Sequence, residues 1–344
     1  TPRLNSMPGF TAYLKISEGC NNTCSFCIIP KLRGEMRSRP IDDIVREAQR
    51  LAESGVMELN LVAQDLTAYG YDLPGRPKLA ELLRQLGQVD VRWLRLHYAY
   101  PRDFSDQLID VMATEPRIVP YLDMPLQHAS DRMLKAMRRG RDRKFIEGLL
   151  DKLRARVPGL VMRSSFIVGF PGETQEDFDE LGAFIEQQRF QHVGVFEFSR
   201  EEGTTSYDLP DQLPARVKAQ RRKALLKLQR GISRAHQDAL VGQELDVLVE
   251  GVSPESELLL QGRHAGQAPE IDGAVYINDG EADVGDIVRV KVEQSGDYDL
   301  VGGIVGTVAK SRFRAPEKPA VPAPSQPAEQ PASRRLLNVL PVRH

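Results

Sequence analysis

The sequence predicts an α/β protein built as an open partial (β/α)6 barrel, followed by a small antiparallel β-barrel. Two observations predict this fold. Six short apolar runs alternate with helical stretches over residues 10–213, and after Gly242 short β-rich runs separated by turn residues take over. Strands that alternate with helices form a parallel sheet, because each crossover helix returns the chain to the same edge. Six such units are too few to close an eightfold barrel, so the sheet is expected to stay open.

The spacing of apolar residues predicts the individual elements of the sheet. A strand is expected over 10–16, where residues alternate up to Ser17-Glu18-Gly19. The other strands are expected in the apolar runs 57–63, 93–98, 119–124, 160–168 and 192–198. Helices are expected from Asp42 or Asp43 to Gly55, over 78–86 and 103–113, from Ser130, from Asp142, and over 176–188 with Thr174 as the cap. Ligands of such sheets bind at the carboxyl ends of the strands, so functional residues are expected there.

The second half of the chain has a different texture. A long helix is expected over 214–240, and its eight basic residues are typical of a solvated face. Five β-rich runs then predict the small barrel: 245–249, 258–261, 274–277, 287–292 and 300–305. Residues 315–333 hold six prolines and five alanines, a composition that favours disorder. The predicted organisation is a cut end or linker (1–9), a sheet domain (10–213), a connecting basic helix (214–241), an acidic β-barrel (242–308) and a disordered tail (309–344).

Composition sets broad limits on the class of protein. A length of 344 residues with 41% apolar residues suffices for a sizeable core, and a net charge of −2 gives no overall attraction to nucleic acid or membranes. No run of about 18 apolar residues predicts a transmembrane helix, and the start at Thr1 has no signal-peptide pattern. Clustered thiols without an export signal predict a cytoplasmic protein with no membrane partner.

All three cysteines of the chain lie in one loop, where Cys20, Cys24 and Cys27 form a Cys-x3-Cys-x2-Cys pattern. An odd number excludes a closed set of internal disulfides. Structural zinc requires four ligands, so zinc stays an alternative if a distant histidine supplies the fourth, and inert buried thiols are another. Three thiolates can also hold three irons of a 4Fe-4S cluster and leave the fourth iron open, which is the prediction we favour.

The trio, with Phe26 directly before its last cysteine, resembles the radical S-adenosylmethionine (SAM) enzymes, whose open iron binds the amino and carboxylate groups of SAM. Residues 8 to about 306 are similar to the methylthiotransferases of that superfamily, and the terminal barrel resembles their TRAM domain. The resemblance is carried by the segments 13–20, 27–34, 61–65, 125–131, 167–174 and 201–204. It implies a 4Fe-4S cluster on the three cysteines that reduces SAM to methionine and a 5′-deoxyadenosyl radical, which takes hydrogen from the substrate. An electron donor is an implied partner.

Residues at the strand ends are the candidates for binding SAM, and each has an alternative role. The candidates are Phe26, Gln64, Asp65, Gln127, Arg163, Ile167, Gly169 and Gly172. Asp65 either accepts hydrogen bonds from the SAM ammonium or caps a loop, and Arg163 within a strand pairs with the SAM carboxylate or with a protein acid. The glycines allow close approach of backbone to a ligand or form a simple turn before the helix. We expect His97 and His128 to be structural, and no catalytic residue beyond the cluster ligands.

Two branches of the family compete for the substrate. One modifies an adenosine of tRNA, and the other modifies an aspartate of a small-subunit ribosomal protein. The segments 63–65, 201–204 and 268–273 resemble the ribosomal-protein branch. Residues 242–306 contain 14 acids against three bases, a formal charge of −11. Nucleic-acid binding requires a basic footprint, so we expect this module to bind a basic ribosomal protein and not RNA directly, unless its charge serves only solubility.

One feature departs from the family pattern. The family holds a second cluster, the source of sulfur, on a separate N-terminal domain with three further cysteines, whereas this sequence has none to spare. We therefore expect one cluster and SAM on this chain, and a SAM-cleaving core without the sulfur-inserting half. A tRNA methylthiotransferase and a non-catalytic zinc or interaction protein stay open as alternatives.

Overall fold

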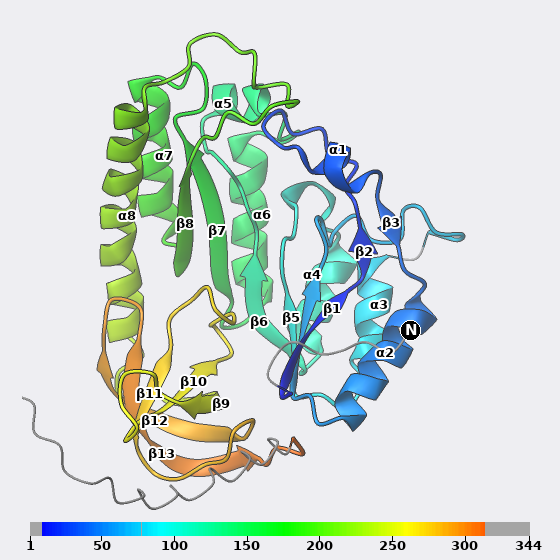
Figure 1. Ribbon diagram of the computed structural model, residues 1–344, viewed down its shortest axis with the longest axis vertical. Coiled ribbons are helices and arrows are strands. Elements are labelled where there is room, and N and C mark those ends of the chain that lie inside the picture. Colours follow the sequence, from blue (N-terminus) through cyan, green and yellow to red (C-terminus); the bar gives the residue numbers. More distant parts are fainter. Residues whose placement is uncertain (1–8, 77, 314–344) are drawn as a thin grey trace, which may run out of the picture. The chain divides into compact units, whose positions relative to one another are not determined.

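The computed structural model describes residues 9–76 and 78–313, and its first part is a six-stranded parallel sheet (Figure 1). The strand order follows the chain, with β1 and β8 at the two ends. The strands are β1 (Thr11–Lys15), β4 (Glu58–Val62), β5 (Trp93–Leu96), β6 (Ile118–Asp123), β7 (Val161–Val168) and β8 (His192–Glu197). All six predicted strands are confirmed, and the sheet stays open as expected.

Helices cover the outer face of the sheet at the positions predicted between the strands (Figure 1). They are α2 (Ile41–Glu53), α3 (Leu79–Leu86), α4 (Asp106–Thr114), α5 (Asp131–Ala136), α6 (Arg143–Arg156) and α7 (Gln175–Gln188), with a 3-10 turn η1 (Pro101–Asp103) before α4. Thr174 caps α7 as predicted. The predicted cap of α2 is wrong, because Pro40 holds the N-cap position. Asp42 and Asp43 lie in the first turn, where their negative charges interact favourably with the positive end of the helix dipole.

Three short elements were not predicted. They are α1 (Ile29–Arg33) and a hairpin of two-residue strands, β2 (Ser17–Glu18) and β3 (Arg37–Ser38), and all three flank the cysteine loop. Elements this short show no hydrophobic periodicity, so the sequence offers no signal for them.

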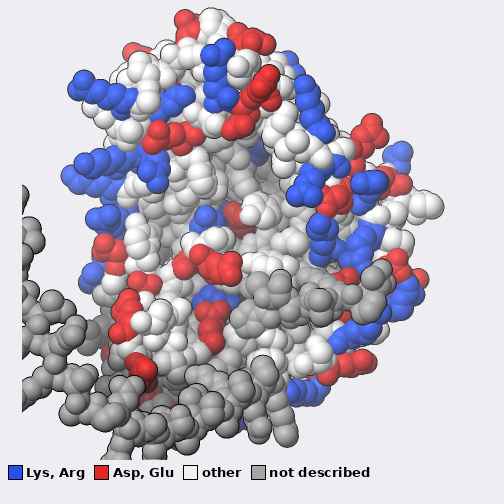
Figure 2. All heavy atoms as spheres, viewed as in Figure 1, with Lys and Arg blue, Asp and Glu red and all other residues white. Residues whose placement is uncertain are grey.

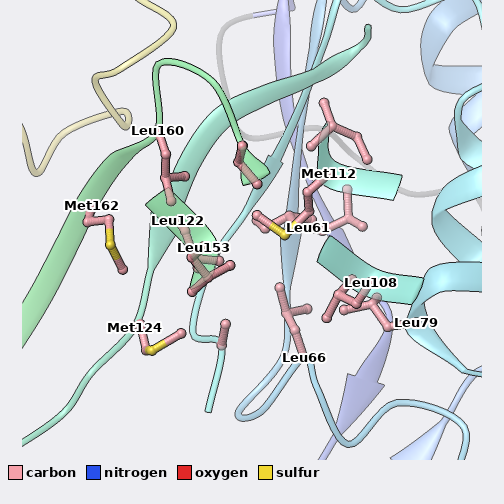
Figure 3. Close-up of a cluster of buried hydrophobic side chains, with 14 of the residues drawn as sticks. Leu61, Leu66, Leu79, Leu108, Met112, Leu122, Met124, Leu153, Leu160 and Met162 are labelled. Atoms are coloured by element: carbon pink, nitrogen blue, oxygen red, sulfur yellow. The ribbon is translucent and has the colours of Figure 1, made fainter. Parts of the chain in front are cut away.

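Apolar side chains from the sheet and its helices form the main core, and Figure 3 labels some of its leucines and methionines. Leu61 of β4, Leu122 of β6 and Leu153 of α6 belong to this core, and each of these side chains is fully buried. Along β7 the even-numbered residues are buried in this core, whereas the odd-numbered residues are only partly covered. Because side chains alternate across a strand, the odd-numbered residues line the inner, concave face of the sheet.

The second part is a closed five-stranded barrel that follows the long helix α8 (Ala215–Asp238). Its strands are β9 (Glu244–Val252), β10 (Leu260–His264), β11 (Val275–Asp279), β12 (Ile287–Ser295) and β13 (Leu300–Ala309). The predicted small barrel is therefore confirmed, with one refinement. The pair β11–β13 is parallel, because an odd number of strands cannot close a ring with every neighbouring pair antiparallel.

Buried charges join the barrel to the sheet. Glu58 of β4 forms ion pairs with Arg95 of β5 at 2.9 Å and with Arg263 of β10 at 2.7 Å, and the three side chains are at most 2% exposed. Arg95 also donates to the backbone oxygen of Ala265 at 2.6 Å. The sheet and the barrel therefore share one buried ionic cluster.

The ends of the chain are only partly described. The predicted tail was expected to begin at 309, but Ala309 ends β13, Lys310 bonds Asp286 at 2.7 Å and Phe313 packs edge-on against Phe10. These first residues belong to the folded part, while 314–344 and 1–8 lie outside the described residues, and the other predicted boundaries stay predictions. Within the described ranges no helix is both long and apolar enough to cross a membrane.

Candidate active site

A cavity of about 650 Å³ opens on the concave face of the sheet, and the cysteine loop forms one side of it. Its lining comes from the loop, from the carboxyl ends of five strands and from the barrel. The residues are Cys20, Asn22, Cys24, Phe26, Cys27, Ile29, Ala63, Gln64, Tyr98, Ala99, Tyr100, Asp123, Pro125, Gln127, Arg139, Arg163, Ser165, Ile167, Phe196 and Ile271. Eight of the eleven residues predicted for the site are among them, namely the three cysteines, Phe26, Gln64, Gln127, Arg163 and Ile167.

The three thiols are free, partly buried and supplied with hydrogen-bond donors. The backbone N–H of Asn22 lies 3.4 Å from Cys20 Sγ, and Arg139 Nη1 lies 3.3 Å from Cys24 Sγ. Burial raises the pKa of the Cys20 and Cys27 thiols. Thiols with a raised pKa stay protonated until a positively charged metal centre binds them. The nearby N–H donors then stabilise the thiolates.

The three thiols fit the ligand set of a 4Fe-4S cluster. Within residues 9–76 and 78–313, no group of three or more His, Cys, Asp or Glu is placed to hold one metal ion. Zinc would need four such donors around one point, and the zinc alternative required a distant histidine to complete them. A 4Fe-4S cluster binds its thiolates through different irons, and the three thiols line one cavity, as such a cluster requires.

Neighbouring elements hold the cysteine loop in place. Ser25 Oγ donates to the backbone oxygen of Ala136 at 2.8 Å, which ties the loop to α5. Asn21 Oδ1 accepts the N–H of Met36 at 2.9 Å. Gly19 has φ 81°, and a Cβ atom there would collide with the carbonyl oxygen of Glu35. Only glycine therefore fits the turn from β2 into the loop without strain.

Asp65 lies behind the cavity wall, and its carboxylate is occupied by the protein. Oδ2 accepts from Asn22 Nδ2 at 2.8 Å, and Oδ1 accepts from the N–H and the hydroxyl of Thr67 at 3.0 and 2.7 Å. The side chain is buried and does not line the cavity. Of the two sequence interpretations, the structure shows the loop contact directly: Asp65 holds Asn22, which itself faces the cavity between two cysteines.

Gln64 offers a free acceptor where Asp65 does not. Gln64 lines the cavity, and its Oε1 is buried without a hydrogen-bond partner in the described part of the chain. Its Nε2 lies 3.5 Å from Glu18 Oε1. A buried amide oxygen without a donor is costly unless a ligand or water supplies one, so this atom marks a position for a ligand N–H or O–H.

Glu173 holds the turn after β7. Gly169 and Gly172 have φ of 74° and 76°, and neither lines the cavity. Glu173 Oε2 accepts the backbone N–H of Gly169 and that of Phe170, and Arg221 of α8 lies 3.1 Å from Glu173 Oε1. The two glycines thus allow the left-handed turn that leads from β7 to α7.

Arg163 pairs with protein acids, as one of its two sequence interpretations expected. Its Nη1 lies 2.9 Å from Asp272 Oδ1 in the loop between β10 and β11, and its Nε lies 3.9 Å from Asp123 Oδ1 at the end of β6. Asp272 also accepts from Tyr121 Oη at 2.8 Å and from the N–H of Ala268 at 2.9 Å. A barrel loop therefore reaches the inner face of the sheet and presents Ile271 to the cavity.

The two histidines that we expect to be structural lie in the interior, near the strand ends. His97 is buried with Nε2 3.1 Å from Asn60 Oδ1. His128 is buried, and its Nδ1 accepts the backbone N–H groups of Ala129 and Ser130 at 3.0 Å each. Neither side chain lines the cavity.

Several residues that line the cavity were not predicted from the sequence. They are Asn22, Tyr98, Tyr100, Asp123, Arg139, Ser165, Phe196 and Ile271. Asn22 lies inside the cysteine loop, and Asp123 ends a predicted strand, so position alone would have found both. Ile271 comes from the barrel, and no local pattern connects it with the sheet.

Comparison with known proteins agrees with this architecture. The model of the radical SAM superfamily matches residues 14–185, and the model of the TRAM domain matches residues 241–305. The chain is 60% identical over 336 residues to the ribosomal protein uS12 methylthiotransferase RimO of Myxococcus xanthus, covering 97% of this chain and 71% of that protein. It is 58% identical over 341 residues to the RimO of Anaeromyxobacter sp. (strain K), covering 99% and 71%.

A solved structure shows a similar fold. The radical SAM methyltransferase TsrM from Kitasatospora setae superposes with a TM-score of 0.50 at 18% identity, over 60% of this chain and 42% of that chain. Similarity at this level concerns the fold alone.

Proposed function

The chain belongs to the RimO-type methylthiotransferases of the radical SAM superfamily, and from this premise we propose that it adds a methylthio group to an aspartate side chain of ribosomal protein uS12. The single observation that carries the proposal is the cavity, which has three free thiols at one end and a protein-lined recess leading away from them. The uS12 protein is the substrate in the names of the relatives, and the aspartate follows from the resemblance of the 63–65, 201–204 and 268–273 segments.

Cys20, Cys24 and Cys27 would hold one 4Fe-4S cluster, which when bound supplies the electron that cleaves SAM. The protein contributes the surroundings of that group. Arg139 stands beside Cys24 and stacks on Tyr100, with the guanidinium carbon 4.2 Å from the ring centroid, so a fixed positive charge faces the thiolates. A fixed cation stabilises the negative charge that three thiolates bring to a partly buried site.

We propose that SAM lies across the cysteine end of the cavity, in contact with Phe26, Gln64, Gln127 and Ile167. Gln64 Oε1, which is buried without a partner in the described residues, would accept an N–H of the SAM amino group. Gln127 has φ 76° and is bonded on both sides to β7, through its N–H to Ser165 and through its oxygen to Ile167, which fixes it at the rim. Asp65, Gly169 and Gly172 would act indirectly. Asp65 would hold Asn22 in place, and the two glycines would shape the turn that follows Ile167.

The barrel is the proposed docking surface for the substrate. Eight of its 14 acids are exposed, namely Glu244, Glu255, Glu257, Glu270, Asp279, Glu281, Asp283 and Glu293. Figure 2 shows acidic side chains over the lower region that Figure 1 assigns to β9–β13, while lysines and arginines follow the edge formed by α8. A basic ribosomal protein would be attracted to this surface, and RNA would be repelled.

Mass spectrometry of uS12 tests the proposal. The protein, reconstituted anaerobically with iron and sulfide and supplied with SAM, a chemical reductant and a sulfide source, is incubated with uS12 and, separately, with tRNA. We expect 5′-deoxyadenosine in both mixtures and, because the sequence has cysteines only for the SAM-cleaving cluster, no methylthio group without the added sulfide source. With that source present, a methylthio group should appear on an aspartate of uS12 and not on the tRNA. Methylthiolated adenosine in the tRNA, with unmodified uS12, would move the protein to the tRNA-modifying branch.

A further inference from the structure

The cavity has a second charged end that the cluster and SAM do not explain. Arg163 and Ile167 both line it from β7, and they are four residues apart. A strand rises about 3.3 Å per residue, so these two positions are separated by about 13 Å along the sheet. Arg163 therefore lies well below Ile167 on the concave face, level with Asp123 of β6.

This deep end is a built site. Asp272 holds Arg163 from one side, and its carboxylate also accepts from Tyr121 and the N–H of Ala268, which fixes the guanidinium. Asp123 stands beside Arg163 on the neighbouring strand. The Asp123 side chain is 3% exposed and lines the cavity, and its Oδ1 has no hydrogen-bond partner among the described residues.

We propose that Arg163 and Asp123, held in place by Asp272 of the barrel, form the subsite that receives the side-chain carboxyl group of the substrate residue. The inference rests on the proposed function, since it requires an acidic side chain as the substrate. Arg163 would donate N–H bonds to the incoming carboxylate, and Asp123 would donate one more as a neutral carboxylic acid. The residue would then be anchored below SAM with its carbon chain pointing toward the rim.

Two features make a carboxylate the fitting ligand. A guanidinium presents several N–H donors in one plane and binds carboxylates in a paired geometry, and only one Arg163 donor is engaged by Asp272 within 3 Å. Burial raises the pKa of Asp123 to about 6, against the opposing charge of Arg163 and with the help of Asp272. A second carboxylate nearby would raise it further, because two carboxylates sharing a site favour one shared proton.

The competing assignment is that Arg163 binds the carboxylate of SAM. The resemblance places that carboxylate on the open iron, beside the cysteines, whereas Arg163 is paired with Asp272 of the barrel and lies four residues before Ile167 on β7. Arg139, which stands 3.3 Å from Cys24, is the cation nearer to that position. The contact of Arg139 with the cysteine loop therefore leaves Arg163 for the substrate.

The proposal is tested by changing both Arg163 of the enzyme and the aspartate of the substrate. The dissociation constants of the reconstituted protein are measured for uS12 and for a uS12 in which the modified aspartate is replaced by asparagine. For the wild-type protein we expect the asparagine form to bind about ten- to hundredfold more weakly, the value of a charge-assisted contact. In Arg163→Gln this ratio should fall to about one, while Lys144→Gln, which removes an exposed charge on α6, should retain the full ratio.

A second variant keeps the test valid if Arg163→Gln fails to fold. Asp123→Asn leaves the Arg163–Asp272 pair intact and supplies a neutral group at every pH. For the wild type the preference for aspartate over asparagine should weaken by about tenfold per pH unit above the pKa of Asp123, and in Asp123→Asn it should be independent of pH. The charged and titratable groups around Asp123 that could also contribute are Arg163, Asp272, Tyr98, Tyr121 and His192.

The possible results distinguish the carboxylate subsite from the proposed function. If uS12 does not bind the wild-type protein, both are overturned. If uS12 binds with a preference for aspartate that survives in Arg163→Gln, or that keeps its pH dependence in Asp123→Asn, the subsite is overturned and the proposed function stands. Weaker SAM binding by Arg163→Gln, with the preference for aspartate unchanged, assigns Arg163 to SAM.

Discussion

At the scale of single residues, the cysteine loop allows a direct test, because no spare thiol exists elsewhere in the sequence. We expect the wild-type protein to hold about four irons and four sulfides after reconstitution, and each of Cys20→Ala, Cys24→Ala and Cys27→Ala to lose the cluster. Thr23→Ala is the matched control, since Thr23 is exposed in the same loop. Iron and sulfide analysis gives the answer, and stoichiometric zinc without sulfide in the wild type would rule out the cluster.

Variants of Asp65 distinguish the two roles that the sequence left open, which are direct contact with SAM and support of the loop. Because its carboxylate holds Asn22 and Thr67, we expect Asp65→Ala to loosen the loop and lower the cluster content at a given reconstitution time. Asn22→Ala should reproduce the effect, since it removes the other half of the same hydrogen bond. A full cluster content combined with weakened SAM binding in Asp65→Ala would instead support direct contact with SAM.

The residues of the site were predictable to different degrees for a physical reason. The cysteines, Phe26, Gln64, Gln127 and Ile167 lie next to strand ends, and parallel strands bring their carboxyl ends to one edge. The partner of Arg163 was not predictable, because Asp272 is 109 residues away and belongs to another domain. A pairing between domains leaves no local periodicity in the sequence.

At the scale of elements, the start of α7 shows how much a single cap contributes. Thr174 and Asp177 form a reciprocal capping box, in which the N–H of Asp177 donates to Thr174 Oγ1 at 3.3 Å and the N–H of Thr174 donates to Asp177 Oδ2 at 2.9 Å. Thr174→Ala should lower the free energy of unfolding by about 1 kcal/mol, whereas Thr174→Ser should retain most of it. Denaturant unfolding of both variants measures the difference, and equal losses would show that the hydroxyl contributes nothing.

The elements that sequence reasoning found are those with a strong repeating pattern. Strand β7 and helix α7 carry period-2 and period-3.6 patterns over eight and 14 residues, and both were predicted within one or two residues. The hairpin of β2 and β3 has two residues in each strand, and the bond from the N–H of Met36 to Asn21 Oδ1 ties it to the cysteine loop. Its stability comes from tertiary contacts, which a local pattern does not contain.

At the scale of the whole molecule, the buried cluster of Glu58, Arg95 and Arg263 should dominate the attachment of the barrel to the sheet. Burial opposes ionisation of Glu58, but the charges of Arg263 and Arg95 outweigh it and lower the Glu58 pKa to about 2, from 4.5. Glu58→Gln should lower the free energy of unfolding by about 3–5 kcal/mol at neutral pH, because two buried guanidinium groups lose their counter-charge. Asp246→Asn, which breaks an exposed pair with Arg289, should cost at most about 1 kcal/mol.

The pH dependence of that loss has a defined sign. A carboxyl group with a depressed pKa contributes stability that is fully present above its unfolded pKa of about 4.5 and is lost as the pH falls through its folded pKa of about 2. The difference in stability between the wild type and Glu58→Gln should therefore be constant above pH 4.5 and shrink between pH 4.5 and 2. A difference that stays constant down to pH 2 would show that Glu58 is not ionised in the folded protein.

The acidic charge of the barrel should determine which partner binds to the protein. Eight exposed acids on the barrel should attract basic uS12 over a distance set by ionic screening, so binding should weaken as salt rises past about 0.15 M, where the Debye length is roughly 8 Å. Replacing exposed Glu255, Glu257 and Glu281 by glutamine should weaken uS12 binding, mainly through a slower association rate, and flatten its salt dependence. The matched control replaces three exposed bases of α8, Arg216, Lys223 and Arg230, by glutamine and should leave uS12 binding equal or tighter. If the control weakens binding instead, or if tRNA binds more tightly than uS12 at the same salt, α8 and not the barrel is the docking surface.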